Sequence, residues 1–240
     1  MNQGLGLSIV IPAFNEDNRL PGYLSQLDAF CQAQDYTCDF VIVDDGSRVP
    51  VSKWLVTTAY RTPIQVIRLP ENQGKGAALK AGVSVTHGKF VLLADADGAY
   101  DAGLIATFMT ELMTGADLVI PYRETALPPF HVKAWLRYVA SAVYRSIVRW
   151  VLLSNIIDAQ CGFKLFEGEI ARALFAQLEE TRWGMDTEIL WRAIRRGSRI
   201  AQLPVTVQND LAESKVSILP NALNMLWLVI KLAWIQRVRR

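Results

Sequence analysis

The sequence contains few cysteines and no pattern typical of a secreted or metal-stabilised protein. Its three cysteines, Cys31, Cys38 and Cys161, lack the spacing of a metal site. We therefore expect reduced thiols, as in a cytosolic protein. The N-terminus has no cationic stretch followed by an apolar segment, so we expect no signal peptide. Internal repeats and low-complexity linkers are absent as well. These absences favour a non-repetitive chain that faces a reducing compartment.

Long apolar runs and a strong net charge are also missing. Hydrophobic residues make up 51% and charged residues 20% of the chain, which is apolar for a soluble enzyme but unlike a protein with several membrane spans. The net charge is +2, but Arg and Lys gather in 133–149 and 231–240. This distribution predicts a surface for phosphates or anionic lipid and argues against general nucleic-acid binding. A length of 240 residues favours one domain, or one domain with a small appendage.

Short apolar segments alternate with segments of helical periodicity along the first half of the chain. Strands are predicted at 7–12, 39–43, 64–69, 89–94 and 117–120. Helices are predicted at 20–33, around 54–55, at 77–85 and at 101–113. This alternation with short connections predicts an α/β fold with a mostly parallel, doubly wound sheet. No G-x-G-x-x-G sequence follows the first strand, which excludes the dinucleotide-binding fingerprint.

Two carboxylates follow the strand at 89–94, in the order Asp95-Ala96-Asp97-Gly98. Polar turns at 15–16 and 44–45 follow two other strands, and all three turns would lie at one edge of a parallel sheet, where ligands bind. Hard oxygen ligands favour Mg²⁺ or Mn²⁺ held together with phosphates. The sequence therefore predicts a nucleotide-binding edge with a metal at the two carboxylates. The alternative is an acidic turn that caps the next helix, here and at 44–45.

Seven segments of the chain resemble a known family. Four of them resemble the family 2 glycosyltransferases of the GT-A type, in this order: Ser8–Glu16, Val41–Ser47, Asn72–Leu79 and Ala94–Gly98. Three later segments resemble the dolichyl-phosphate and polyprenyl-phosphate β-glucosyltransferases within that family: Asp158–Phe166, Trp183–Leu190 and Ser214–Ser217. The resemblance covers nearly the whole chain and implies the GT-A fold.

The resemblance implies an inverting, metal-dependent glycosyltransferase. Such an enzyme would move glucose from UDP-glucose to a polyprenyl phosphate, dolichyl or undecaprenyl, and give a β-linked lipid-phosphate sugar. Two alternatives stay open: transfer to a saccharide or protein hydroxyl, and a nucleotide-sugar-binding module without turnover. A hydroxyl acceptor needs a general base, whereas a monophosphate is largely ionised near neutral pH and needs cations to hold it.

The matching motifs imply a role for each polar residue of the site. The implied donor-binding residues are Pro12, Ala13, Asn15, Glu16, Asp44, Asp45, Lys75 and Asp95. The implied metal ligands are Asp95 and Asp97, and the expected catalytic carboxylates are Asp97, Asp158 and Asp186. The cations expected at the acceptor phosphate are Arg123, Lys133, Arg137 and Lys215. Glu188 follows Asp186 at a helix start, where a negative charge also suits the helix dipole. Cys161 is expected to be a small packed residue.

Two segments are predicted to lie on a membrane surface. In 133–153, basic residues occupy one helical face and a tryptophan-rich apolar face lies opposite, as in an interfacial helix. The alternative is an ordinary amphipathic helix packed on the sheet. The apolar tail ends in arginines, and its apolar part of about 14 residues is too short to span a bilayer. We therefore predict a catalytic domain at 1–217, a membrane-associating helix at 218–240, and a monotopic or peripheral protein on the cytoplasmic face of a membrane. The oligomeric state is left open.

Overall fold

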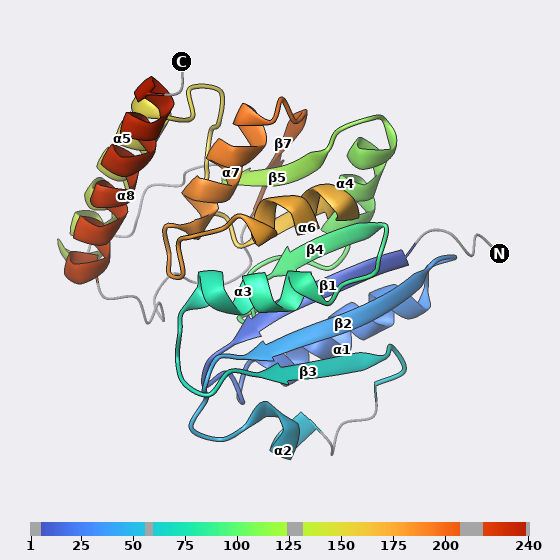
Figure 1. Cartoon of the computed structure of the whole chain (residues 1–240). Helices are drawn as coiled ribbons and strands as arrows, with labels where there is room; N and C mark the ends of the chain where they lie inside the picture. The colour runs from blue at the N-terminus through green and yellow to red at the C-terminus, as the bar shows by residue number, and fades with distance from the viewer. Residues whose placement is uncertain (1–5, 56–59, 124–131, 207–217, 239–240) are drawn as a thin grey trace.

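A computed structural model describes residues 6–55, 60–123, 132–206 and 218–238 (Figure 1). In the two long helices near the end of the chain, side chains are described from residue 142 and, with gaps, from residue 224. Of the predicted site residues, Lys215 lies outside the described part of the chain, and Lys133 and Arg137 are described in their backbone only.

A seven-stranded sheet with the order β3-β2-β1-β4-β6-β5-β7 forms the centre of the protein. Its strands are β1 (Gly6–Ala13), β2 (Thr37–Asp44), β3 (Ile64–Arg68), β4 (Phe90–Ala94), β5 (Leu118–Arg123), β6 (Phe163–Glu167) and β7 (Ile200–Val205). Neighbouring strands run parallel, except that β6 is antiparallel to both β4 and β5. Strand β4 is buried throughout, which explains its continuous apolar sequence. The prediction of a mostly parallel α/β sheet is confirmed.

Strands β6 and β7 were not among the predicted strands. Strand β6 contains Lys164, which is buried, so the segment does not form an apolar run. Strand β7 lies at the edge of the sheet, is mostly half-buried, and includes Gln202 and Pro204. Both strands depend on pairing with distant segments, which local periodicity does not report.

Helices cover both faces of the sheet. They are α1 (Leu20–Gln32), α2 (Val51–Leu55), α3 (Lys75–Ser84), α4 (Leu104–Met113), α5 (Val132–Val151), α6 (Gly168–Ala176), α7 (Met185–Arg195) and α8 (Ile218–Val238). One apolar cluster joins the sheet to α1 and α4, and a second joins it to α3, α6 and α7. The proline in the first turn of α1 suits a helix start, because that position needs no hydrogen-bonded N–H group. The doubly wound arrangement is therefore confirmed.

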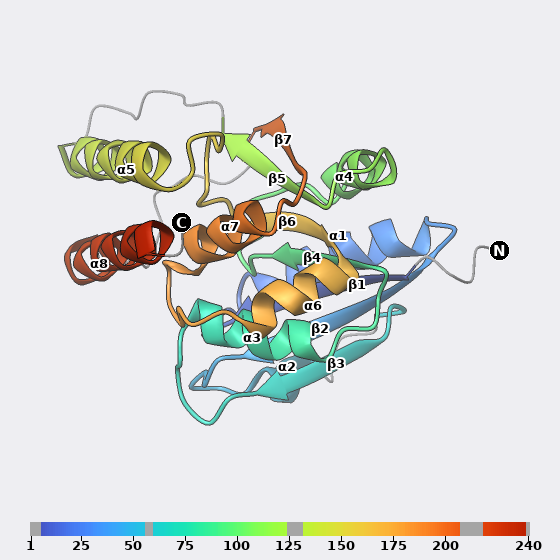
Figure 2. The same cartoon turned by 45° about the horizontal axis from the view of Figure 1, so that its top comes forward.

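Helices α5 and α8 contact each other and run side by side at one end of the molecule (Figures 1 and 2). Leu228, Val229 and Leu232 of α8 are buried in the same apolar cluster as α3, α6 and α7. Among the described helices, none combines the length and apolar character that a membrane crossing requires. The division at residue 217 into two units stays a prediction.

Candidate functional site

The carboxyl ends of β1, β2 and β4 lie at the same edge of the sheet, because these strands pair in parallel. The turns that follow them carry Asn15, Asp45 and Asp95, as predicted. Strand β6 runs the other way, so the residues that precede it reach this edge. A Cβ atom on Gly162 would lie 1.7 Å from Oδ2 of Asp95, so the backbone before β6 lies directly against that carboxylate.

Lys75 and Asp95 form an ion pair at the centre of this edge. Lys75 Nζ lies 2.7 Å from Asp95 Oδ1. Burial alone would lower the pKa of Lys75, but the nearby charges of Asp95 and Asp186 raise it above its usual range. Burial raises the pKa of Asp95, although the Lys75 ammonium opposes this change. Asp97 is half-buried in the next turn, and its Oδ1 accepts a hydrogen bond from the N–H group of Ala99 at 3.1 Å.

Asp186 is held by a lysine that the sequence did not single out. Lys164 Nζ lies 2.5 Å from Asp186 Oδ1, and the two side chains are only 1% and 5% exposed. The same ammonium group donates a hydrogen bond to the carbonyl oxygen of Cys161. A buried carboxylate needs such a partner, since an unpaired charge in the interior is costly. The signal available in the sequence was a lysine within the otherwise apolar segment Phe163–Phe166.

Asp158 pairs with Arg123, one of the cations predicted for the acceptor. Arg123 Nε lies 2.8 Å from Asp158 Oδ2. Burial would raise the pKa of Asp158, but the hydrogen bonds and charge of Arg123 outweigh burial and hold that pKa below its usual range. The Cys161 thiol donates a hydrogen bond to Asp158 at 3.3 Å, and burial raises the pKa of that thiol to about 11. Cys161 is 0% exposed, which agrees with a packed residue.

The turns after β1 and β2 are joined by their own side chains. The N–H group of Asn15 donates to Ser47 Oγ at 3.0 Å, and Asn15 adopts a left-handed backbone with φ of 54°. Asp45 accepts hydrogen bonds from the backbone N–H groups of Gln73 and Gly74 at 2.8 and 2.9 Å, so it fixes the turn that carries Lys75. A hollow of about 250 Å³ opens here, lined by Asn15, Glu16, Asp17, Ser47, Arg48, Val49, Val51 and Trp54.

Several predicted donor residues have structural partners. The carboxylate of Asp44 is buried and accepts hydrogen bonds from the backbone of Ser47 and Val51 and from Arg68. This is the turn-and-cap arrangement that the sequence left open for 44–45, and a direct donor contact by Asp44 stays a prediction. Pro12 and Ala13 form the end of β1, and Glu16 forms an ion pair with Arg19 at 2.6 Å.

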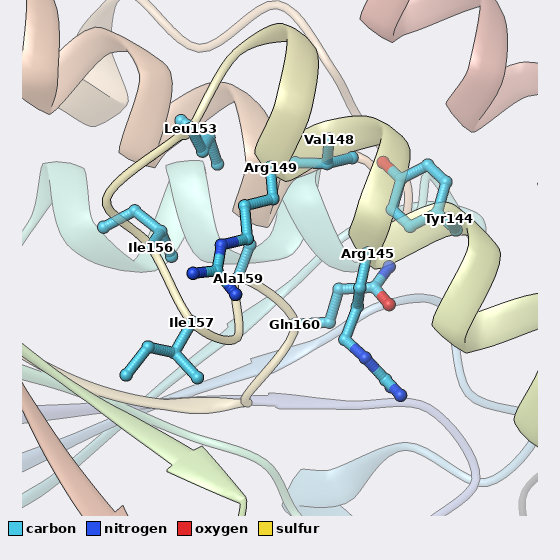
Figure 3. A pocket seen from close by; sticks show the side chains of 9 residues that line it. All are labelled: Tyr144, Arg145, Val148, Arg149, Leu153, Ile156, Ile157, Ala159 and Gln160. Carbon is cyan, nitrogen blue, oxygen red and sulfur yellow. The ribbon is translucent and has the colours of Figure 1, made fainter.

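Two arginines of α5 line a small hollow beside the turn that holds Asp158 (Figure 3). They are Arg145 and Arg149, which line the hollow together with Ile156, Ala159 and Gln160. The sequence had placed both arginines on the basic face of an interfacial helix, opposite its apolar face. Their position next to 156–160 could not be read from helical periodicity, because it depends on how the chain returns after α5.

The donor set at Asp95 and Asp97 fits a divalent ion that also binds phosphates. Among the residues that the structure describes, no three His, Cys, Asp or Glu side chains gather into a metal site. Mg²⁺ and Mn²⁺ are commonly held by one or two carboxylates together with phosphates of the substrate. The Asp95 carboxylate already binds one positive charge, the ammonium group of Lys75.

Sequence comparisons relate this chain to a known protein family. Residues 8–175 match the sequence profile described as Glycosyl transferase family 2. A dolichyl-phosphate beta-glucosyltransferase of Dictyostelium discoideum is 32% identical over 83% of this chain and 65% of its own length. A protein of the same name from Trichomonas vaginalis is 33% identical over 97% of this chain and 74% of its own length. The chain thus spans about two thirds to three quarters of these relatives.

Solved structures share the fold at low sequence identity. Glucosyl-3-phosphoglycerate synthase of Mycobacterium tuberculosis, crystallised with Mn²⁺, UDP-glucose and phosphoglyceric acid, has a TM-score of 0.70 at 16% identity over 96% of this chain and 80% of its own. Mannosyl-3-phosphoglycerate synthase of Rubrobacter xylanophilus has a TM-score of 0.69 at 18% identity over 98% of this chain and 74% of its own. The predicted GT-A fold is confirmed by these likenesses.

Proposed function

This chain belongs to glycosyl transferase family 2, and from that membership we propose that it transfers glucose from UDP-glucose to a polyprenyl phosphate such as dolichyl phosphate. The proposal takes the acceptor from relatives named dolichyl-phosphate beta-glucosyltransferase. The donor and the use of a divalent ion are supported by the fold neighbour crystallised with Mn²⁺ and UDP-glucose. The reaction inverts the anomeric centre: an oxygen of the acceptor phosphate bonds to the anomeric carbon, and the bond from that carbon to the diphosphate breaks.

The ion pairs of two buried carboxylates favour a phosphate acceptor over a hydroxyl acceptor. Asp158 and Asp186 are each held by a cation, and the pKa of Asp158 lies below its usual range. A carboxylate held in this way is a poor general base, whereas a phosphate acceptor arrives already ionised and needs none. In this proposal Asp158 orients Arg123, and Arg123 holds the acceptor phosphate together with Lys133, Arg137 and Lys215.

The departing nucleoside diphosphate needs positive charge. In this proposal Asp95 and Asp97 hold Mg²⁺ or Mn²⁺, which supplies that charge at the donor phosphates. Lys75 adds a fixed ammonium group on the same side, and Asp45 keeps the turn before Lys75 in place. The hollow at the turns after β1 and β2, lined by Asn15 and Ser47 among others, offers room for part of the nucleoside.

A polyprenyl acceptor requires that the protein reach a membrane. Among the side chains that the structure describes in α5 and α8, three tryptophans are strongly exposed: Trp150 by 90%, Trp227 by 64% and Trp234 by 66%. We call them the tryptophan surface. Exposed tryptophans on helices that also carry Lys and Arg suit the interface between headgroups and acyl chains. We therefore propose that α5 and α8 attach the protein peripherally to the cytoplasmic face of a membrane.

A screen of nucleotide sugars against a polyprenyl phosphate, with and without Mg²⁺ or Mn²⁺, tests the proposal. We expect labelled glucose from UDP-glucose to enter the organic phase only when a divalent ion is present. Labelled product that stays in the aqueous phase with a saccharide acceptor would favour transfer to a hydroxyl. Nucleotide binding without turnover for every donor and acceptor would favour a binding module.

A further inference from the structure

The segment 178–183 between α6 and α7, here called the strap, lies against the start of α3. The N–H group of Ala77 donates to the carbonyl oxygen of Thr181 at 3.1 Å. A Cβ atom on Gly74 would lie 2.5 Å from that same oxygen, and one on Gly76 would lie 2.3 Å from the carbonyl oxygen of Glu180. The backbone of the strap is therefore in direct contact with the turn that carries Lys75.

The strap also reaches the side chain of Lys75. Its last residue, Trp183, has its ring centroid 5.7 Å from Lys75 Nζ. Such a contact between an ammonium group and an aromatic face is attractive. Because Lys75 also pairs with Asp95, the strap helps to define where this ammonium group lies at the sheet edge.

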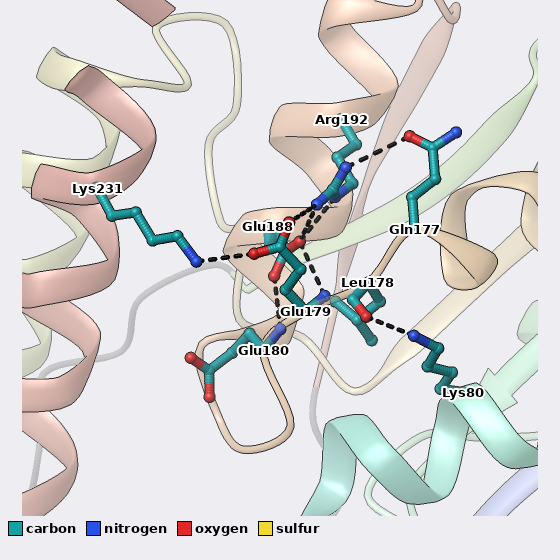
Figure 4. A network of polar contacts seen from close by, with 8 residues as sticks. All are labelled: Lys80, Gln177, Leu178, Glu179, Glu180, Glu188, Arg192 and Lys231. Atoms are coloured by element: carbon teal, nitrogen blue, oxygen red, sulfur yellow. Dashed lines mark hydrogen bonds and ion pairs between the residues drawn. The ribbon is translucent and has the colours of Figure 1, made fainter. Parts of the chain in front are cut away.

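Glu188 of α7 holds the strap from the other side (Figure 4). Its two carboxylate oxygens accept hydrogen bonds from the N–H groups of Glu179 at 3.1 Å and Glu180 at 2.8 Å. Arg192 lies 2.6 Å from the same carboxylate. Glu188 is 1% exposed, and both oxygens are directed at the strap. The carboxylate of Glu188 therefore holds the backbone of the strap in place. Its position two residues after Asp186 in the sequence does not indicate this role.

We propose that Glu188 is a positioning residue that fixes the strap, and through the strap fixes Lys75 and its turn for a nucleoside diphosphate. The identity of the ligand in this inference rests on the proposed function. The effect of Glu188 on the turn that carries Lys75 does not depend on it. The substitution Glu188→Gln retains the shape of the side chain. It places an amide group against one of the two strap N–H groups, so one donor loses its acceptor, and Arg192 loses one of its two carboxylate partners and keeps Glu179 at 3.3 Å.

Hydrogen exchange and UDP binding test the role in the full chain. In Glu188→Gln we expect faster amide exchange in residues 74–79, and a dissociation constant for UDP with Mn²⁺ that rises about tenfold, as for other residues that orient a ligand-binding group. The KM for the sugar donor should rise while the KM for polyprenyl phosphate stays unchanged. Glu167→Gln is the matched control, because Glu167 also accepts a backbone N–H group, that of Ile170, but at the start of α6.

The outcomes separate this inference from the proposed function. A folded Glu188→Gln protein with unchanged exchange in 74–79 and unchanged UDP affinity overturns the positioning role. Faster exchange in a protein whose wild type binds no UDP supports the positioning role and overturns the proposed donor. If Glu188→Gln does not fold, Trp183→Ala tests the last contact of the strap, since Trp183 is 41% exposed. Wild-type UDP affinity in Trp183→Ala overturns the connection to Lys75, and weaker binding supports it.

Discussion

Gly162→Ala places one methyl group at the centre of the proposed donor site. The added Cβ atom would lie 1.7 Å from Oδ2 and 2.3 Å from Cγ of Asp95, far inside van der Waals contact. The Asp95 carboxylate must therefore move by at least about 1 Å, and a displacement of that size costs about a hundredfold in rate. The same crowding should lower the free energy of unfolding by about 1–3 kcal/mol. The ion pair of Asp95 with Lys75, 2.7 Å in the native protein, should be lost or rearranged.

The assay is release of UDP from UDP-glucose with polyprenyl phosphate and Mn²⁺, together with urea unfolding of the same preparation. Gly22→Ala is the matched control, because a Cβ atom there meets nothing within 4 Å. It should retain full activity and gain about 0.5–1 kcal/mol of stability, since alanine favours a helix more than glycine does. If Gly162→Ala folds and turns over substrate at the wild-type rate, the site does not require the close approach of residue 162 to Asp95, which refutes the prediction.

Three further predictions concern the charges of the site and the tryptophan surface. Lys164→Met leaves the buried carboxylate of Asp186 without its partner and should cost about 3–5 kcal/mol in urea unfolding. Replacing Asp186 by Leu in the same chain should recover part of that loss, and no recovery would argue against the pair. In the wild type, Asp158 has a pKa below the ordinary 3.8, so its contribution to stability is present above that value and is lost as the pH falls through the lower folded pKa. Arg123→Met should therefore be most destabilising near neutral pH, and the difference from wild type should shrink below about pH 4; a difference that does not vary with pH would contradict this. Replacing the tryptophan surface by glutamine should reduce sedimentation with anionic vesicles without loss of fold, and unchanged sedimentation would remove its role as an attachment.

Most of the parallel half of the fold could be predicted from the sequence, because it consists of apolar strands that alternate with helices. The strands at 7–12, 39–43, 64–69, 89–94 and 117–120 all have counterparts in the structure. Asp45 and Asp95, which follow such strands, lie at one edge of the sheet as the sequence predicts. Residues that follow a strand lie at this edge only when the strand runs parallel to β1, β2 and β4.

Strand β6 shows why the rest of the site could not be predicted by the same rule. It runs antiparallel between β4 and β5, so the segment before it, with Asp158 and Gly162, reaches the edge that other strands reach with their carboxyl ends. Family resemblance had pointed to that segment, but its contact with Asp95 depends on pairing between residues far apart in the chain. The partner of Asp186 was hidden for the same reason, since Lys164 lies in β6 and Asp186 in α7.

The last helix of the chain is attached to the strap, and this affects how α8 should be studied. Lys231 lies 2.8 Å from Glu179, within the group of contacts around Glu188 (Figure 4). A protein cut before α8 would lose this tether together with Trp227 and Trp234 of the tryptophan surface, so any change in vesicle attachment would be mixed with a change at the turn that carries Lys75. Lys231→Gln removes the tether and the contact of Lys231 Nζ with the ring of Trp227, whose centroid lies 5.8 Å away, whereas glutamine at Trp150 and Trp234 alone leaves both contacts in place. This reciprocal pair of full-length proteins separates the two effects, which truncation cannot do.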